Sequence, residues 1–355
     1  MSQLDFEYTS LPNKVYFGRG KKAVLPDVLR PFQKTFVIAS LRARKQLSEL
    51  EQHRGADSLF HFPEVIQHVP EYLVEKALAA FHKAQSDVLV AIGGGSAIGL
   101  AKALALETGT PIVALPTTYS GSEMTNIWGK TTPQGKRTGR DARVLPRCVI
   151  YDPELTTGMP VALAATSAMN AMAHLMEAVY AFDSNPITYH NSLLGMDRLR
   201  LGMQHLGREK ALSPEANEFL LFGAFLAGKG LCEVSMALHH KAAHVLGGSF
   251  GMEHSGVHTV LQAYVLEYQW EALSDTIRED LKKALDHSYP PQALMELAAG
   301  MGAPTTLKEI GFKKEDIPQA VELMLANPYP NPKPLAREGL EEMLERAYSG
   351  RVPKE

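Results

Sequence analysis

The chain has 355 residues, of which 45% are hydrophobic and 21% are charged, a composition typical of a soluble enzyme large enough for two domains. Its formal net charge of -3, from 36 basic and 39 acidic residues, gives no reason to expect a nucleic acid or an anionic membrane as a partner. The chain has two cysteines in no paired or metal-type spacing, no apolar leader and no run of eighteen apolar residues, so we expect a cytoplasmic protein without membrane spans.

The first part of the chain alternates short apolar runs with helical segments. The run DVLVAI at 87–92 is the clearest buried strand, and a glycine turn, a helix and another strand follow it. This order predicts an open, mostly parallel α/β sheet over residues 1–158. We expect its strands at 15–18, 34–40, 58–62, 87–92, 111–115 and 143–152, and its helices at 41–53, 71–85 and 97–108.

Beyond residue 152 strand-like runs almost vanish, and Ala, Leu, Met, Glu and His recur at helical spacing. We therefore predict a domain boundary near residue 158 and an all-helical domain over 159–355. Its helices are expected at 161–182, 189–205, 214–232, 237–246, 256–268, 290–301 and 335–349.

The turn Gly93-Gly94-Gly95-Ser96 lies directly between a strand and a helix. Glycines allow close approach of the backbone to a phosphate, and the first turn of a helix offers unpaired N–H groups. Thr117 and Thr118 end the next strand and add hydroxyls at the same sheet edge, where ligands of such sheets gather. These residues favour a dinucleotide site. The spacing departs from GxGxxG, so a tight structural turn is the alternative.

The end of the strand at 34–40 bears on the choice of dinucleotide. Ser40 stands where an acidic residue would bind the ribose of NAD, and Arg42 and Arg44 follow it. Without that acid nothing repels a 2′-phosphate, and Arg42 would attract one. We expect NADPH to be accepted alongside NADH, and the sequence does not rank them.

Five of the thirteen histidines lie between residues 238 and 258. Side chains four residues apart share one face of a helix, and we expect Gly247, Gly248 and Gly251 to end the first histidine helix. Imidazole titrates near neutral pH and is the commonest metal ligand. The cluster is a candidate for metal binding, proton transfer or anion binding, with histidines that pack in a core or close helix ends as the alternative. The pairs with this spacing are His240 with His244, His254 with His258 and, upstream, Asn170 with His174.

Four segments of the chain resemble, in the same order, those of the iron-containing alcohol dehydrogenase superfamily, and within it the maleylacetate reductase branch. They are GGGSAIGLAK, LPTTYSGSEMTN, NAMAH and HHKAAHVLGG…MEHSGVH. The resemblance runs from FGRG near residue 17 to the NPYPNP loop. It implies an N-terminal dinucleotide-binding α/β domain, an all-helical C-terminal domain, an active site in the cleft between them and a cytoplasmic homodimer. It also implies reduction of maleylacetate, a small dianion, to 3-oxoadipate with NADH or NADPH during the bacterial breakdown of aromatic compounds.

In metal-dependent members of this superfamily an Asp and three His hold a divalent cation. Asn170 replaces the carboxylate by a neutral amide, which removes one negative charge from the site. Three histidines alone can hold zinc, but metal-free histidines can protonate and attract a dianion, so we predict no catalytic metal. The corresponding positions are Asn170, His174, His240 and His254, with His244 as a further histidine of the motif.

Three rival functions remain open at this point. The first is a metal-dependent alcohol or polyol dehydrogenase in which Asn170 is a tolerated ligand variant. The second is a lyase or cyclase that uses NAD only transiently. The third is a nucleotide-binding regulator, against which the histidine cluster argues.

The expected reaction adds hydride to an enone and protonates the resulting enolate, which requires an oriented cofactor, donors at the ketone oxygen and a proton source. We expect the cofactor pyrophosphate on residues 93–96, near Thr117 and Thr118. The histidines would supply donors and the proton, and His258 is expected nearer to the site than His239. Arg137 and Arg143 are weaker candidates, better explained as solvated surface charges. Expected at or near the substrate are His174, His240, His244, His254, Asn170, Tyr119, Ser122 and Lys130.

Overall fold

The computed structural model describes residues 6–353, apart from the side chains of Arg42, Arg44, Lys45 and Ala56. The chain forms two compact units, an α/β unit Ser10–Met159 and a helical unit that contains Pro160–Glu355 together with the chain up to Thr9. The Tyr8 hydroxyl donates to Oε1 of Glu233 at 2.9 Å. The described residues before Ser10, 6–9, therefore pack with the helical unit, whereas the sequence predicted them in the α/β domain.

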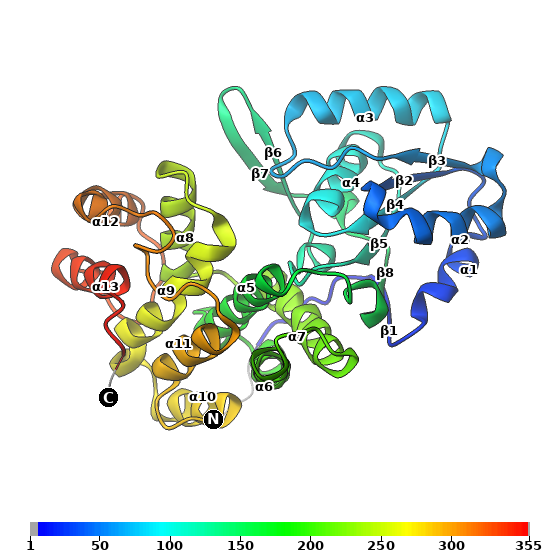
Figure 1. The fold of residues 1–355 in the computed structure, drawn as a ribbon. Coiled ribbons are helices and arrows are strands. Elements are labelled where there is room, and N and C mark those ends of the chain that lie inside the picture. The colour runs from blue at the N-terminus through cyan, green and yellow to red at the C-terminus, as the bar shows by residue number, and fades with distance from the viewer. Residues whose placement is uncertain (1–5, 354–355) are drawn as a thin grey trace. The chain divides into compact units, whose positions relative to one another are not determined.

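The α/β unit is built on a six-stranded sheet in which every neighbouring pair is parallel (Figure 1). Its central strands are apolar and rich in Val, Ile and Ala, and they are buried along their length because helices cover both faces. The predicted α/β fold is confirmed. The strands, in spatial order, are β1 (Lys14–Phe17), β8 (Cys148–Tyr151), β5 (Ile112–Pro116), β4 (Val88–Gly93), β2 (Thr35–Ala39) and β3 (Leu59–Phe62).

The chain changes direction across this sheet between β2 and β4. β2 leads to β3 on one side, and β4 leads to β5 on the other side. In open α/β sheets ligands bind outside the carboxyl ends of the strands at such a switch point. Ser40 follows β2 and Gly94 follows β4, so both lie at this position.

Four α-helices accompany the sheet: α1 (Leu25–Leu29), α2 (Arg44–Arg54), α3 (Glu71–Ala84) and α4 (Gly95–Thr108). An antiparallel hairpin, β6 (Ile127–Thr132) and β7 (Gly135–Arg140), was not predicted. Its sequence carries glycines and basic residues in place of a β-branched apolar face, so no alternating pattern is visible. The backbone of Thr131 pairs with Val69 and Pro70, and this contact places the hairpin beside the start of α3 (Figure 1).

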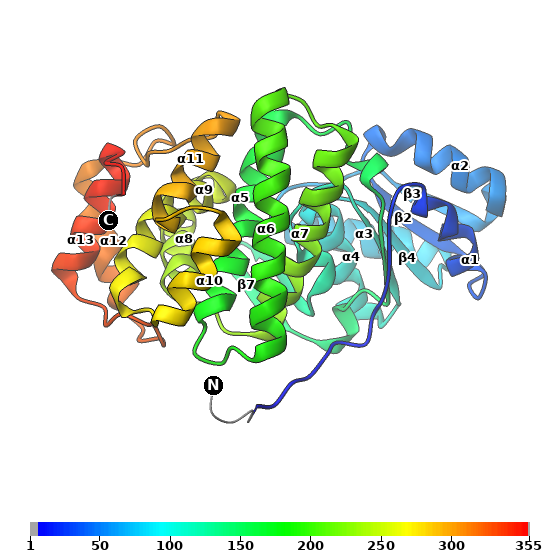
Figure 2. The ribbon, with the colours of Figure 1, turned by 90° about the horizontal axis from the view of Figure 1, so that it is seen from below.

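In the helical unit, α5 is buried at nearly every position after its first turn, and α6, α7 and α9 pack around it (Figure 2). The described part of this unit has nine α-helices. Two of them, α10 and α12, were not predicted, because they are short and begin in charged segments. The helices are α5 (Val161–Tyr180), α6 (Pro186–Glu209), α7 (Pro214–Glu233), α8 (Leu238–Ser249), α9 (His254–Gln269), α10 (Asp275–Leu285), α11 (Pro290–Met301), α12 (Ile317–Leu325) and α13 (Arg337–Ser349).

The helix α8 corrects one expectation about the histidine stretch. Gly247 and Gly248 lie inside α8 and do not end it. The break comes only afterwards, where Gly251 adopts a φ of 67° that favours glycine. His254 then opens α9, with the Glu253 carboxylate accepting from the N–H groups of Ser255 and Gly256.

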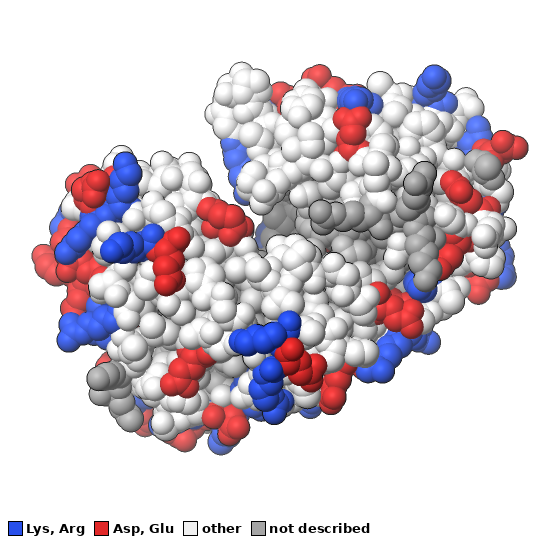
Figure 3. All heavy atoms as spheres, viewed as in Figure 1, with Lys and Arg blue, Asp and Glu red and all other residues white. Residues whose placement is uncertain are grey.

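Basic and acidic side chains are interspersed on the face of each unit seen in Figure 3. No single helix among the described residues is long and apolar enough to cross a membrane, and only α7 and α8, bent by 95° at their junction, pass on length and composition as a pair.

Candidate active site

The glycine turn joins β4 to α4 without a side-chain cap. Gly94 is the N-cap residue, and the first turn of α4 contains no acidic residue. The backbone N–H groups of Gly95 and Ser96 have no acceptor among the described residues. Unpaired N–H groups and the positive end of the helix dipole favour an anion such as a pyrophosphate at this turn.

Gly94 also lies in close contact with the next loop. A Cβ atom on Gly94 would lie 2.8 Å from both Cγ2 and Oγ1 of Thr118. The Thr117 N–H donates to the Gly93 carbonyl at 3.0 Å, which holds the two loops together. The absence of a side chain at position 94 thus keeps open a cradle between two strand ends, and its residues fit a dinucleotide.

Lys102, which the sequence analysis missed, anchors α4 to the segment after β5. Its side chain is 1% exposed, and its Nζ donates to the carbonyls of Ser122 at 2.6 Å, Thr125 at 2.7 Å and Ile127 at 2.8 Å. It also donates to Thr125 Oγ1 at 2.9 Å. The sequence signal was a lone basic residue in the apolar run GSAIGLAKALALET.

Glu123 forms a second buried polar contact beside this anchor. Its Oε1 accepts from the Tyr151 hydroxyl at 2.8 Å, and both side chains are fully buried. Burial raises the pKa of the Glu123 carboxyl. Both charged side chains, Lys102 and Glu123, therefore belong to the interior framework beneath the cofactor turn.

Three residues expected near the substrate lie in or just after this segment. Tyr119 is fully buried, and burial raises the pKa of its hydroxyl while a hydrogen bond with Thr156 acts in the opposite direction. Ser122 begins a short 3-10 helix, Ser122–Met124. Lys130 lies on β6, with Nζ 3.8 Å from Oε1 of Glu71. Tyr119 directly follows Thr118, which lies beside Gly94, and the Ser122 carbonyl accepts from Lys102 of α4. Contact of these residues with substrate stays a prediction.

The arginine candidates lie on exposed parts of the α/β unit. Arg137 is exposed on β7. Arg143 donates from Nη2 to Oδ2 of Asp141 at 2.7 Å, and this hydrogen bond lowers the pKa of Asp141 to about 2. Both fit the expected solvated charges. The Arg42 side chain, proposed to attract a 2′-phosphate, lies outside the described residues.

Three helices bring the predicted histidines together. The ring of His174 on α5 stacks on that of His240 on α8, with centroids 4.9 Å apart. His258 on α9 lies 5.0 Å from His240 and 4.4 Å from His254 between ring centroids. His244 is 6.1 Å from His254. Asn170 lies one turn before His174 on α5, and its buried Oδ1 has no hydrogen-bond partner.

Burial decides the charge of the inner imidazoles. His174, His240 and His258 have pKa values well below the usual range because burial removes the water that stabilises the charged form, and neighbouring imidazoles add to this effect. These three are neutral near pH 7. For His174 and His240 this argues against the expectation that they protonate to attract a dianion. For His254, which is half-buried, the expectation stays a prediction, and His244 is exposed.

A chain of hydrogen bonds links three of the rings. Nε2 of His239 lies 2.7 Å from Nδ1 of His258, and Nε2 of His258 lies 3.1 Å from Nε2 of His254. With one proton on each ring, each shared contact holds one proton, so the third proton sits on the outer nitrogen of His239 or of His254. The outer Nδ1 of His239 is buried and has no partner. This favours a lone pair there and a proton on Nδ1 of His254.

The residues at the positions of the metal ligands do not fit a divalent cation. Nε2 of His254 is already bonded to His258, and Asn170 offers a neutral amide. Among the residues that the structure describes, no three His, Cys, Asp or Glu side chains are placed to hold a metal ion. The absence of a catalytic metal from the reaction stays a prediction.

Glu177 is a second residue that the sequence analysis missed. It lies on α5, one turn after His174, and is fully buried. Its Oε2 lies 2.5 Å from Nδ1 of the His240 ring, and its carboxylate accepts from backbone N–H groups at the start of α8. The available signal was helical spacing, since residues 170, 174 and 177 share one face of α5.

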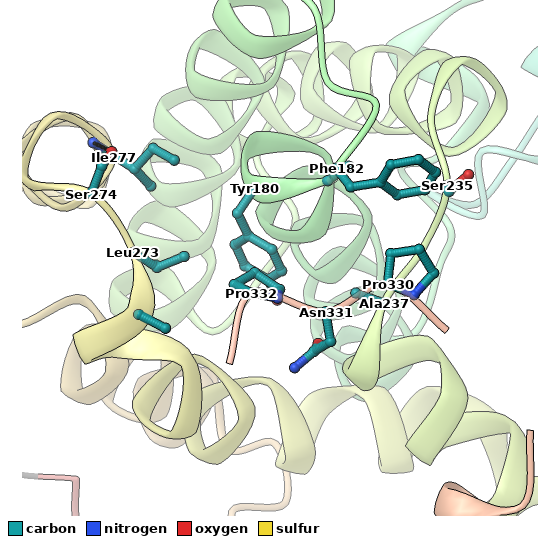
Figure 4. Close-up of a pocket in the computed structure, with 12 residues that line it drawn as sticks. Tyr180, Phe182, Ser235, Ala237, Leu273, Ser274, Ile277, Pro330, Asn331 and Pro332 are labelled. Atoms are coloured by element: carbon teal, nitrogen blue, oxygen red, sulfur yellow. Dashed lines mark hydrogen bonds between the residues drawn. The ribbon is translucent and has the colours of Figure 1, made fainter. Parts of the chain in front are cut away.

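The helical unit also contains a cavity of about 320 Å³ with a mainly apolar lining (Figure 4). Tyr180 lines it from the end of α5, and Asn331 and its flanking prolines line it from the loop before α13. None of the residues predicted for the active site lines this cavity. The lining residues are Tyr180, Ala181, Phe182, Ser235, Ala237, Ala272, Leu273, Ser274, Ile277, Pro330, Asn331 and Pro332.

Comparison with known proteins finds similarity over both units. A family model described as iron-containing alcohol dehydrogenase matches residues 12–153, and one described as the C-terminal part of the Fe-containing alcohol dehydrogenase family matches residues 164–348. A maleylacetate reductase of Sphingobium indicum is 39% identical over 353 residues, with 99% of each chain covered. One of Delftia acidovorans is 40% identical over 353 residues, covering 99% of this chain and all of the relative. The crystal structure of maleylacetate reductase from Agrobacterium tumefaciens matches with a TM-score of 0.94 at 34% identity, over 99% of this chain and 100% of that one.

Proposed function

Because the chain belongs to the iron-containing alcohol dehydrogenase family, we propose that it reduces maleylacetate to 3-oxoadipate with NADH or NADPH. It is an oxidoreductase, and its full-length similarity to proteins named maleylacetate reductase is the observation that carries the proposal. The same relatives do not favour the alternative, a metal-dependent alcohol or polyol dehydrogenase. The neutral Asn170 and the hydrogen-bonded His254 support the choice as well.

The α/β unit has the task of holding the cofactor. The nicotinamide, when bound, supplies a hydride to the alkene carbon β to the ketone. The N–H groups of Gly95 and Ser96 would donate to the pyrophosphate, with the hydroxyls of Thr117 and Thr118 beside them. Lys102 holds the segment after β5 against α4, so the two walls of the cradle keep a fixed spacing.

The helical unit has the task of stabilising charge on the substrate. Hydride addition leaves an enolate, whose oxygen needs donors and whose neighbouring carbon needs a proton. The half-buried His254 would donate through Nδ1, since its Nε2 is taken by His258. The exposed His244 would bind a substrate carboxylate.

The proposal extends to the choice between NADH and NADPH, to the oligomeric state and to the location in the cell. No acidic residue follows β2 at Ser40, so neither NADH nor NADPH meets a repelling carboxylate there. The family resemblance supports a homodimer in the cytoplasm.

The test is oxidation of NADH, and separately of NADPH, with maleylacetate, before and after treatment with a chelator and with metal analysis of the same sample. We expect activity that survives chelation. An Asn170→Asp variant serves as the comparison, because it restores a carboxylate and should lower kcat at least about tenfold by repelling the dianion. Activity that requires added iron or zinc would support the alcohol dehydrogenase alternative. Absence of cofactor oxidation would overturn the assignment, and turnover without net loss of NADH would indicate the lyase class.

A further inference from the structure

The start of α8 is capped by side chains that lie far from it in the sequence. The N-cap residue is Ala237, which offers no side-chain acceptor. The first N–H groups of a helix need acceptors from elsewhere, and in a buried helix they cannot use bulk water. Both side-chain acceptors come from distant parts of the chain. Asn331 Oδ1 accepts from the Leu238 N–H at 3.2 Å. The Glu177 carboxylate accepts from the N–H groups of Ala237 and of the two residues after Leu238.

The Glu177 carboxylate is surrounded by donors on the helix that it caps. Its Oε1 accepts from the His239 N–H at 2.7 Å. Its Oε2 accepts from the N–H groups of Ala237 at 3.1 Å and His240 at 3.3 Å, and faces Nδ1 of the His240 ring at 2.5 Å. One buried side chain therefore fixes both the N-terminus of α8 and the orientation of an imidazole in the histidine cluster.

The donors around Glu177 determine which nitrogen of His240 carries the proton. Because three N–H groups already point at the two oxygens, the carboxylate is the form that satisfies them all. An ionised carboxylate only accepts, so Nδ1 of His240 must donate. His240 then keeps a lone pair at Nε2, an atom that is buried and has no hydrogen-bond partner.

We propose that Glu177 is a positioning residue that holds His240 in the tautomer protonated at Nδ1, so that His240 offers the active site an acceptor at Nε2. This inference rests on the proposed function in so far as His240 belongs to that active site. The proposed tautomer gives the imidazoles different roles. His240 does not donate to the ketone oxygen, and the donors there come from the outer histidines.

The first test needs no change to Glu177. Imidazole nitrogens with and without a proton differ strongly in ¹⁵N chemical shift, so a spectrum of the enzyme labelled with ¹⁵N-histidine reports the tautomer directly. The His240 signals are assigned by their loss in His240→Asn. We expect protonated Nδ1 and unprotonated Nε2. The opposite tautomer in the wild-type protein would overturn the proposal.

The second test is kinetic and uses Glu177→Gln, which keeps the shape and one acceptor of Glu177 but removes its charge. Loss of an orienting partner behind a working histidine typically costs about 10- to 100-fold, and we expect kcat with maleylacetate to fall by at least about tenfold while KM changes less than about threefold. The matched control is Glu233→Gln. The Glu233 side chain is 5% exposed and accepts from Thr188 at 2.8 Å and Tyr8 at 2.9 Å. It also pairs with Lys229 at 3.0 Å, but among the described residues it contacts no histidine.

Glu233→Gln should change kcat less than about twofold. A kcat loss in Glu177→Gln no larger than that of the control, or a loss confined to KM, would contradict the positioning role. A wild-type enzyme inactive with maleylacetate would refute the proposed function alone, because the tautomer is read from the spectrum without turnover.

Discussion

Each unit contains a charged side chain that is buried almost completely and bonded to several backbone groups, and these two charges have opposite sign. In the α/β unit Lys102 is 1% exposed and donates to main-chain carbonyls, whereas in the helical unit Glu177 is 0% exposed and accepts from main-chain N–H groups. Both tie an α-helix to a segment far from it in the sequence. In each case the protein replaces lost water by several backbone dipoles, which is the condition for burying a charge.

The difference lies in what the two side chains contact. Lys102 Nζ donates to backbone carbonyls and one hydroxyl at 2.6–2.9 Å, although a buried oxygen without a partner, Oε2 of Glu123, lies beside this anchor as well. Glu177 leads through the His240 ring to Nε2, and nearby Nδ1 of His174 and Oδ1 of Asn170 are likewise buried without a partner. Unpaired buried polar atoms are rare and need a reason. Lys102 anchors backbone segments to one another, whereas Glu177 also orients a histidine of the predicted active site.

The largest effect is expected from removing the Lys102 charge. Lys102→Met leaves three carbonyls and the Thr125 hydroxyl without their donor, so we expect the free energy of unfolding to fall by about 3–5 kcal/mol. Urea denaturation measures it. The control is Lys76→Met, whose exposed ion pair with Glu64 should contribute at most about 1 kcal/mol. Equal losses in the two variants would show that Lys102 is no anchor.

Glu177→Met should be the next largest, because it leaves three backbone N–H groups and one ring N–H unpaired. We expect a loss of about 2–4 kcal/mol in the free energy of unfolding, together with a mixture of His240 tautomers in the ¹⁵N spectrum. The comparison with Lys102→Met is then direct, since only Glu177→Met should alter the histidine spectrum. A change of the His240 tautomer in Lys102→Met would show that Lys102 also affects the histidine cluster, which contradicts a purely structural role.

The helical unit should also lose stability in acid through its buried imidazoles. Burial lowers the pKa of His239 to about 3, below its unfolded value near 6.5. Between these values the unfolded chain binds a proton that the folded chain does not, so stability falls as the pH drops below 6.5. His239→Asn removes this contribution. Between pH 7 and pH 5 the variant should therefore lose about 2 kcal/mol less than wild type in urea titrations. Parallel pH profiles would contradict the neutral, buried state of His239.

The sequence predicted features that depend on local pattern. The parallel sheet was visible because β2, β4 and β5 are continuous apolar runs, and the cofactor turn because glycines follow such a run directly. The histidines at positions 240, 254 and 258 were visible through their spacing along single helices.

The sequence did not predict features that depend on distant partners. Glu177 lies 60 residues or more from the N–H groups that it caps, and Lys102 lies 20 residues or more from its carbonyls. The neutral state of His174 and His240 was not predicted for the same reason. Their desolvation comes from the packing of α5, α8 and α9 and not from neighbours in the sequence.

The smallest predicted effect concerns the cradle at the switch point of the sheet. In Gly94→Ala the new methyl group would lie 2.8 Å from Thr118, so Thr118 must move away from the cofactor turn. Overpacking of this size costs about 1 kcal/mol, and we expect KM for NADH to rise about fivefold with little change in kcat. Gly300→Ala on α11 is the control, because a Cβ there meets no atom within 4 Å.

A double variant identifies the cause. Adding Thr118→Ala removes the two atoms that the new methyl would contact, although the Thr118 Cβ remains 3.4 Å away. If crowding alone raises KM, Gly94→Ala should raise it less in the Thr118→Ala background than in the wild-type background. Purely additive effects would mean that residue 94 acts by contacting the cofactor directly. The glycine turn would then be a ligand-binding feature, like the histidine cluster, and not a structural anchor like Lys102.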